Sequence, residues 1–585
     1  MPLGRFLSAI EDRIATIAME DLREMVLAFA ESVEASERLV FLERFGARPA
    51  RPLEPIEALL TDVELLEEEA ESTGEPRWDD DDDYRDRHGW SSDDEFREPD
   101  WAPNLVELLR RAGVVFLRGD PAAAVQAYER LFSVAAAAIE NGWSVATEPS
   151  ETDVMREAAA RYLRAVGECG KREDRPDRLR RAASLLGRAL LGNGVSYAAV
   201  EGARAAAPAA REMLLEDWVS ALAPLVERDD PYYGDWAHRL LLEVVEQLEG
   251  LPGLAQLARR GGRRAGRNFV AWFDAARRQG DDATALIAGE EGLRSLRRSA
   301  ERAALAERVA MMAHAAGRLE DAVVARVEAW DSLPSLDRLL KIVEAARRAE
   351  VEEATITELA KRRPPSGVPA PIRVVLLVLG GQLDTAVKEN RAGLAPSVDK
   401  LPRATDASLA AELLIPILLA AGADATRHDR FAGSVIAGLL NTAETLADRG
   451  YFPSSFIDGF DEDDDAPELP PDVSHDLALG NLLAKALERM AIPTAKRHLY
   501  LDAGTTLAAA AVARIVGNKD RRRYSQAAAL AVAHAEAIAI TSGRAAGDAA
   551  AEAAQSQYPR HTAYRSELMS TRMRSPFLTS PGHFR

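Results

Sequence analysis

Hydrophobic residues along most of the chain recur at the three-to-four-residue spacing of an amphipathic helix. One run near the N-terminus would line a single helical face with Leu7, Ile10, Ile14, Ile17, Leu22, Val26 and Phe29. A second run, from Leu39 to Phe45, stops at Gly46, a residue typical of helix C-termini. Alternating β-branched runs bounded by turn residues are essentially missing. The pattern therefore predicts an all-α fold that opens with a helical hairpin region at residues 1–60.

A helix, a short turn with glycine, and an alanine five positions after that glycine recur along the chain. The pairs are Gly119/Ala124, Gly280/Ala285, Gly317/Ala322 and Gly381/Ala386. Two antiparallel helices that close on a tight turn need a small residue where the second helix approaches the first. The recurrence predicts helical hairpins. An alanine-rich helical bundle with glycine turns that occur by chance is the alternative interpretation.

The segment from Arg302 to Pro334 resembles the tetratricopeptide repeat, a helix–turn–helix unit of 34 residues. It matches the small residues, turn glycine and terminal proline of that family at Ala310, Gly317, Ala322, Ala329 and Pro334. The copy around Gly119 lacks the proline and matches at Ala112, Gly119, Ala124 and Tyr128. In the other two copies Gly289 and Asn390 stand where an aromatic residue is usual, and the copies are unevenly spaced. The resemblance implies a curved solenoid of antiparallel helical hairpins over residues 105–455.

Two end segments read EDLREMVLAFAESVEASERLVFLERFG near the N-terminus and RRRYSQAAALAVAHAEAIAITSG, followed by YPRHTAYRSEL, near the C-terminus. They are similar to the helical regions of bacterial SWIM zinc-finger-associated proteins, in which a helical-repeat body accompanies a zinc module of three cysteines and one histidine. Cys169 is the sole cysteine of this chain, so the zinc module is not carried over, and no metal or other cofactor is predicted. The resemblance implies helical structure at both ends, with helical repeats at residues 475–570.

Two acidic segments interrupt the helical pattern. The first lies within residues 61–104 and contains Asp79–Asp83, where like charges repel and favour extended chain. Aromatic residues recur through it at spacings of five or six, namely Trp78, Tyr84, Trp90, Phe96 and Trp101. This acidic aromatic strip is a solvated loop pinned by its rings, a docking element for a basic partner, or an autoinhibitory segment that covers the protein's own basic groove. The second segment, at residues 456–474, joins two helical blocks, and a basic tail follows at 571–585.

Arginines are concentrated in the middle of the chain. The cluster comprises Arg259, Arg260, Arg263, Arg264 and Arg267, followed by Arg277, Arg278, Arg294, Arg297 and Arg298. One interpretation is a site for phosphate or carboxylate, because guanidinium groups contact both in bidentate fashion. The other is a set of ordinary interhelical salt bridges. The neighbouring Phe269, Trp272 and Phe273 are predicted to be core residues rather than platforms for nucleic-acid bases.

The chain of 585 residues carries 94 acidic and 73 basic side chains, a formal net charge of −21. This balance disfavours a protein that coats nucleic acid or an anionic membrane. Met1–Ile10 lacks the basic and apolar regions of a secretory signal. The apolar stretch Leu413–Ala423, interrupted by Pro416, is too short to span a membrane. A cytoplasmic location is predicted.

Candidate catalytic chemistry is sparse. Lys171 and Arg172 would lower the pKa of the Cys169 thiol, although a lone helical cysteine is usually a small buried hydrophobe. The nine histidines are scattered, and no serine-hydrolase, phosphate-loop, dinucleotide-binding or kinase motif is present. The sequence therefore predicts a protein without catalytic residues.

Taken together, these patterns predict a non-catalytic, cytoplasmic protein–protein interaction scaffold or adaptor. The arginine cluster and the acidic aromatic strip are predicted to contact a protein partner. One alternative is a nucleic-acid-associated regulator that binds through Arg259–Arg298 and is gated by the strip. Another is a structural subunit of a larger assembly with a separate ATPase or nuclease.

Overall fold

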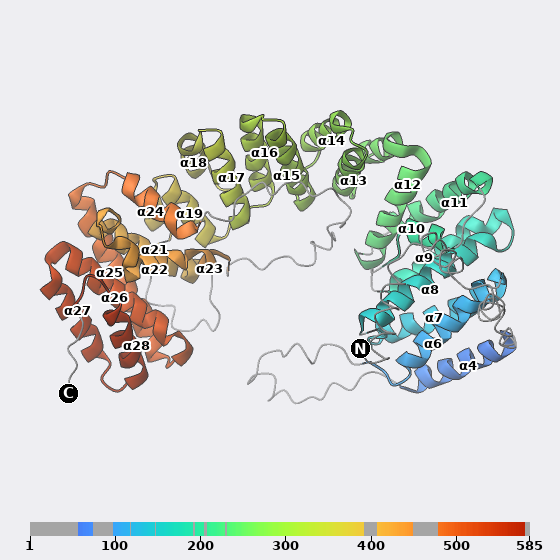
Figure 1. Cartoon of the computed structure of the whole chain (residues 1–585), viewed down its shortest axis with the longest axis horizontal. Helices are drawn as coiled ribbons and strands as arrows, with labels where there is room; N and C mark the ends of the chain where they lie inside the picture. The colour runs from blue at the N-terminus through green and yellow to red at the C-terminus, as the bar shows by residue number, and fades with distance from the viewer. Residues whose placement is uncertain are drawn as a thin grey trace, which may run out of the picture. The chain divides into compact units, whose positions relative to one another are not determined.

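The computed structural model describes residues 56–73, 98–117, 119–146, 148–190, 194–203, 208–227, 231–390, 406–448 and 478–579 (Figure 1). Every regular element within these ranges is an α-helix or a short 3-10 helix. The predicted all-α fold class is therefore confirmed. The N-terminal amphipathic runs, most of the acidic aromatic strip and the acidic loop at 456–474 lie outside the described residues.

The chain divides into two compact units, Met1–Leu248 and Glu249–Arg585. The division falls within α12 (Pro231–Arg259), where Gly250 has φ 66° and ψ −154°, values outside the helical range. Glycine adopts such a conformation without steric cost. Two helical segments therefore meet at a kink, and the second of them, ending at Arg259, belongs to the C-terminal unit.

The N-terminal unit is a set of packed helices. Its remaining elements are α4 (Ile56–Thr73), α6 (Ala102–Leu117), α7 (Pro121–Glu140), α8 (Pro149–Glu168), η2 (Arg172–Asp174), α9 (Arg175–Ala189), α10 (Tyr197–Gly202) and α11 (Pro208–Val226). Helices α6, α7, α8 and α9 pack against their neighbours in sequence, and α4 lies on α6 and α7. The rings of Tyr128, Phe132 and Tyr162 lie 5.7 to 6.2 Å apart in its core. Tyr128 is the aromatic residue at the matched position of the first predicted repeat.

Helix α4 runs from the predicted N-terminal hairpin region into the start of the range predicted as the acidic insertion. Leu59, Val63 and Leu66 form a buried stripe, which anchors the helix although its other face is rich in glutamate. Glu67 accepts a hydrogen bond of 2.9 Å from Nε of Arg130 on α7. Burial of the stripe and this ion pair hold the helix in place as far as Thr73.

The first part of the C-terminal unit is a series of helical hairpins. They are α13 (Ala265–Arg278) with α14 (Asp282–Ser295), α15 (Ala300–Ala315) with α16 (Leu319–Ser332), α17 (Leu336–Arg348) with α18 (Glu352–Lys361), and α19 (Ala370–Leu379) with α20 (Leu383–Glu389). The two helices of each hairpin pack against each other, and the second helix of each of the first three packs against the first of the next.

The hairpins share one turn geometry. A residue with positive φ ends the first helix of each, namely Gly280 (74°), Gly317 (72°), Glu350 (59°) and Gly381 (71°). The next residue donates its backbone N–H to a carbonyl five residues earlier, as in the bonds of 2.9 Å from Asp281 to Ala276 and 2.8 Å from Arg318 to Ala313. When Glu350 is included, the spacing between successive turns is close to 34 residues, the length of a tetratricopeptide repeat.

Glu350 is a glutamate in a backbone conformation that favours glycine. We expect Glu350→Gly to raise the free energy of unfolding by about 1 kcal/mol, because it removes the strain at an exposed position. The same substitution at Glu358, inside α18, should lower stability by about 1 kcal/mol. Denaturant titrations followed by far-UV circular dichroism measure both. Equal effects at the two positions would contradict the left-handed conformation of Glu350.

The second part of the C-terminal unit is a bundle. Its elements are α21 (Asp406–Ala423), η4 (Ala425–Arg427), η5 (Phe431–Gly433), α22 (Val435–Asn441), α23 (Ala443–Asp448), α24 (Leu479–Arg489), α25 (Thr494–Gly517), η6 (Arg521–Arg523), α26 (Tyr524–Ser542), α27 (Arg544–Gln557) and α28 (Thr562–Met573). Helix α21 packs on α25 and α26, and α26 packs on α27 and α28. After α28, Phe577 and Leu578 are buried, so the predicted basic tail begins as packed chain.

Helix α21 is buried from Leu409 to Ala423 and continues through Pro416. Leucine and isoleucine side chains on all sides hold it in the core, which outweighs the backbone hydrogen bond lost at proline. Among the described helices, α25 alone has the length and apolar composition needed to cross a membrane. In this structure α25 packs against α21 and α26.

Candidate functional site

The described part of the acidic aromatic strip does not present a ring to solvent. Trp101 is 2% exposed and lies at the start of α6, with its side chain in the interior. In this structure the ring of Trp101, which was predicted to contact a partner, is therefore not on the surface. Trp78, Tyr84, Trp90 and Phe96, the other predicted contacts of the strip, lie outside the described residues.

Arg259 forms an interhelical salt bridge, as the ordinary interpretation of the cluster predicts. Its Nε and Nη2 donate to the two carboxylate oxygens of Glu291 on α14, at 2.8 and 3.0 Å. Its guanidinium carbon also lies 4.9 Å from the ring centroid of Trp272. The hydrogen bonds from Arg259 lower the pKa of Glu291, which is therefore a carboxylate at neutral pH. This pair fastens the end of α12 to α14.

Other arginines of the cluster pair more loosely with acidic side chains. Arg267 and Glu301 are 4.0 Å apart, Arg298 and Asp331 are 3.6 Å apart, and exposed Arg294 lies 3.4 Å from exposed Glu290. Within the described part of the chain, Arg260 and Arg297 are exposed, and their side chains make no hydrogen bond or ion pair. The cluster is thus a mixture of fixed structural pairs and available guanidinium groups.

Several of these arginines line an open pocket of about 740 Å³, which we call the arginine pocket. It is formed by the end of α12, the start of α13, the end of α14 and the start of α15. The charged side chains of its lining are Arg259, Arg263, Arg294, Arg297, Glu291 and Glu301. Positive groups thus outnumber negative ones by four to two. Of the five arginines predicted to contact a partner, only Arg259 and Arg263 line this pocket; Arg260, Arg264 and Arg267 do not.

The wall between α12 and α13 is a turn of two glycines. Gly261 and Gly262 have φ 75° and 93°, and no atom lies within 4 Å of the position a Cβ would take at either. Arg264, the N-cap of α13, provides no side-chain hydrogen bond to the helix. Beneath the pocket, Phe269, Trp272 and Phe273 are buried, which confirms that they are core residues. The pocket is therefore open and basic, without an exposed aromatic ring of this group.

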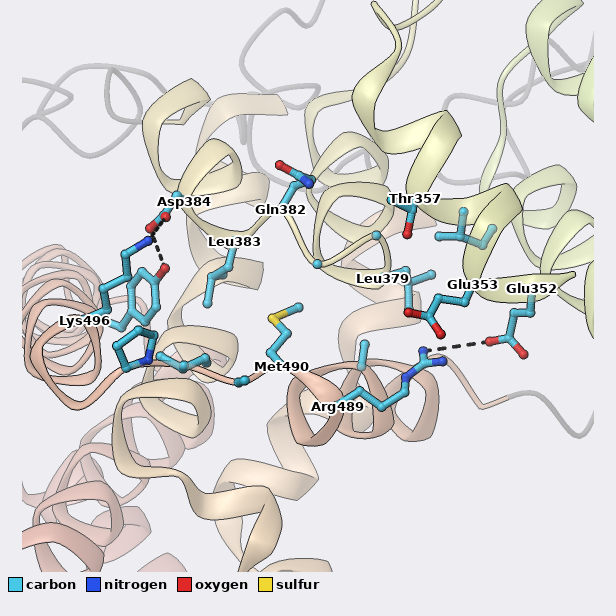
Figure 2. Close-up of a pocket in the computed structure, with 18 of the residues that line it drawn as sticks. Glu352, Glu353, Thr357, Leu379, Gln382, Leu383, Asp384, Arg489, Met490 and Lys496 are labelled. Carbon is cyan, nitrogen blue, oxygen red and sulfur yellow. Dashed lines mark hydrogen bonds and ion pairs between the residues drawn. The ribbon is translucent and has the colours of Figure 1, made fainter.

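A second pocket, of about 380 Å³, was not predicted (Figure 2). Its walls are α18, the α19–α20 turn and the α24–α25 connection, so we call it the α18–α25 pocket. Leu379, Leu383 and Met490 provide apolar lining, and an ion pair lies toward each end (Figure 2). No sequence motif marks this site, because its walls come from segments about a hundred residues apart.

The two ion pairs of the α18–α25 pocket differ in strength. Glu352 lies 3.9 Å from Arg489 and accepts a hydrogen bond of 3.0 Å from Arg347. Asp384 accepts hydrogen bonds of 2.5 Å from both Lys496 Nζ and Tyr500 Oη. These bonds, with that from Lys496 the larger contribution, lower the pKa of Asp384. Burial and the same carboxylate raise the pKa of Tyr500, so its hydroxyl is a permanent donor.

We expect the Asp384–Lys496 interaction to contribute about 0.5–1 kcal/mol at neutral pH, the range of exposed ion pairs. Because the folded pKa of Asp384 lies below its ordinary value, this stability is present above the ordinary pKa and lost as pH falls through the folded pKa. A double-mutant cycle of Asp384→Asn and Lys496→Met at pH 7 and at pH 3 measures it. A coupling energy that stays constant between these pH values would contradict the assignment.

The described residues contain no group of three or more histidine, cysteine, aspartate or glutamate side chains that could hold a metal ion. Burial raises the pKa of the Cys169 thiol, with Arg178 acting in the opposite direction. Cys169 is partly exposed rather than buried, and burial, not the charges of Lys171 and Arg172, is the main influence on its pKa.

Protein-family models and curated proteins were both compared with the chain, and neither comparison finds a match. The likeness to tetratricopeptide repeats therefore depends on the residues and on the hairpin geometry described above. The arginine pocket and the α18–α25 pocket are the two candidate functional sites.

Proposed function

We propose that the chain is a non-catalytic, cytoplasmic protein–protein interaction scaffold, built as a curved solenoid of tetratricopeptide-like hairpins. The observation that carries this proposal is the series of hairpins α13 to α20, with one turn geometry repeated at near-regular intervals. Stacked hairpins create extended surfaces that hold a peptide or a folded partner. The arginine pocket opens between the first two of these hairpins and supplies a charged contact point.

A nucleic-acid-associated regulator is the second candidate, favoured by the excess of arginine over glutamate in the arginine pocket. Two observations count against it. The net charge of −21 repels a polyanion at long range, and the aromatic residues beneath the pocket are buried. The scaffold is therefore the better supported of the two functions, and a subunit role in a larger assembly is a special case of it.

Affinity purification of the tagged full chain from its own cells tests the proposal, with nuclease-treated and untreated samples compared by quantitative mass spectrometry. A scaffold should retain one or two proteins in fixed stoichiometry after nuclease treatment. If all partners are lost with nuclease, the nucleic-acid function replaces the scaffold. If no partner is retained in either sample, the scaffold proposal is wrong.

A further inference from the structure

We infer that the arginine pocket binds an anionic side chain, a carboxylate or a phosphate, carried by an acidic segment of a partner protein. The inference rests on the proposed scaffold function and specifies the chemistry of its partner. Arg294 and Arg297 are the residues that we expect to bind the anion, and Arg263 also lines the pocket.

The charges of the pocket favour an anion because its carboxylates are already engaged. Glu291 is held by both donors of Arg259, and Glu301 lies 4.0 Å from Arg267. Arg297 makes no ion pair within the described residues, and the pairing of Arg294 with Glu290 is between two exposed side chains. An incoming carboxylate or phosphate would pair with the exposed guanidinium groups of Arg294 and Arg297 without displacing a buried partner.

The backbone of the pocket adds to this positive potential. The N-termini of α13 and α15 meet at its base, since a Cβ added to Gly266 would lie 2.7 Å from Cβ of Glu301. The partial positive charge of a helix lies at its N-terminus. Gly261 and Gly262 place no side chain over this end of α13, so a ligand side chain can approach the backbone closely.

An acidic protein segment fits the pocket better than a nucleic acid does. A volume of about 740 Å³ accommodates a few side chains, in the range of small-ligand sites, and not a polymer groove. The protein as a whole is strongly acidic, so attraction is confined to the few ångströms around the arginines. A short acidic segment needs only this local attraction, whereas phosphate backbone binding needs an extended basic surface.

Fluorescence anisotropy of the full chain tests the inference with three labelled probes: an eight-residue glutamate peptide, a peptide of the same length with two phosphoserines, and a short single-stranded DNA. We expect the peptides to bind and Arg294→Gln/Arg297→Gln to weaken them about tenfold or more, from the loss of charge-assisted hydrogen bonds. The relative affinity of the two peptides distinguishes carboxylate from phosphate.

Two further variants control for charge and folding. Arg318→Gln/Arg362→Gln removes the same charge from exposed arginines of the same unit outside the pocket, and should change affinity less than twofold. Glu291→Gln removes a negative charge from the lining and releases Arg259, so it should strengthen peptide binding severalfold. A gain of binding cannot result from misfolding.

The inference is overturned if the parent chain fails to bind either peptide at millimolar concentration, or if the pocket and control variants bind them equally. Pocket-dependent binding of the DNA in preference to both peptides would also overturn it, in favour of the nucleic-acid function. If any of these results is obtained and the parent chain still retains a protein partner from cells, the binding site is wrong but the proposed scaffold function stands. If the peptides bind at the pocket but no partner is retained from cells, the binding site stands and the proposed scaffold function is wrong.

Discussion

Glu536→Leu should lower the free energy of unfolding by about 3 kcal/mol or more, because it removes the acceptor for three donors, two of them buried. Glu536 lies on α26, is fully buried, and accepts hydrogen bonds of 3.1 Å from the backbone N–H groups of both Val435 and Ile436. It also accepts one of 2.7 Å from the Ser575 hydroxyl. The carboxylate thus ties the start of α22 and the chain after α28 to the centre of the bundle.

The glutamine variant separates shape from charge. Glu536→Gln keeps one acceptor oxygen and should cost about 1–2 kcal/mol, less than leucine. Burial raises the pKa of Glu536 above its ordinary value. Its contribution is therefore greatest below the ordinary glutamate pKa and declines as pH rises through the folded pKa. The advantage of the parent chain over Glu536→Gln should decline in the same direction.

Denaturant titrations between pH 4 and pH 8 measure these differences. Glu567→Leu is the matched control, since Glu567 is an exposed residue on α28 and its replacement should change stability by at most about 0.5 kcal/mol. Equal stability of Glu536→Leu and the parent chain would show that the three hydrogen bonds do not hold the bundle together.

Gly422→Ala should destabilise the chain by about 2–3 kcal/mol, because the new methyl group has no space in a packed core. A Cβ at Gly422 would lie 2.5 Å from the backbone nitrogen of Leu501 and 2.7 Å from its Cα. Both contacts are with backbone, so α21 and α25 must move apart, and neither side chain rotation nor local adjustment relieves them. Gly422 thus sets the separation of the two central helices of the bundle.

The same substitution in α22 should have the opposite sign. Gly438 is exposed, and no atom lies within 4 Å of its would-be Cβ, so Gly438→Ala should stabilise by about 0.5–1 kcal/mol. Thermal denaturation followed by circular dichroism compares the two variants directly. Stabilisation by both alanines would contradict the close approach of α21 and α25.

The sequence predicts the hairpins well because their turn chemistry is local. Ala124, Ala285, Ala322 and Ala386 are all buried five residues after a glycine with positive φ. The hairpin turn at Glu350 was not predicted, because a glutamate occupies the position where glycine is favoured. Helix α4 was not predicted, because its many acidic residues obscure a short stripe of buried residues. The acidic composition of this segment is more conspicuous in the sequence than the helical spacing of its few buried apolar residues.

The candidate site is predicted less completely, because it depends on contacts between distant segments. The density of arginine between residues 259 and 298 indicates a basic region, but not which side chains share a pocket. Arg294 and Arg297 join the lining because the end of α14 meets the turn after α12. Asp384 and Lys496 are brought together only by the packed bundle. Trp101 is the opposite case, because the sequence suggests a surface role but the side chain is buried.

Hydrogen–deuterium exchange of the full chain, alone and with its co-purified protein partner, tests the central claim most directly. The proposed scaffold predicts that bound partner slows exchange in the hairpins α13 to α20, with the strongest protection around residues 258–301. Protection confined to the N-terminal unit or to α21–α28 would contradict the claim that the hairpin series holds the partner.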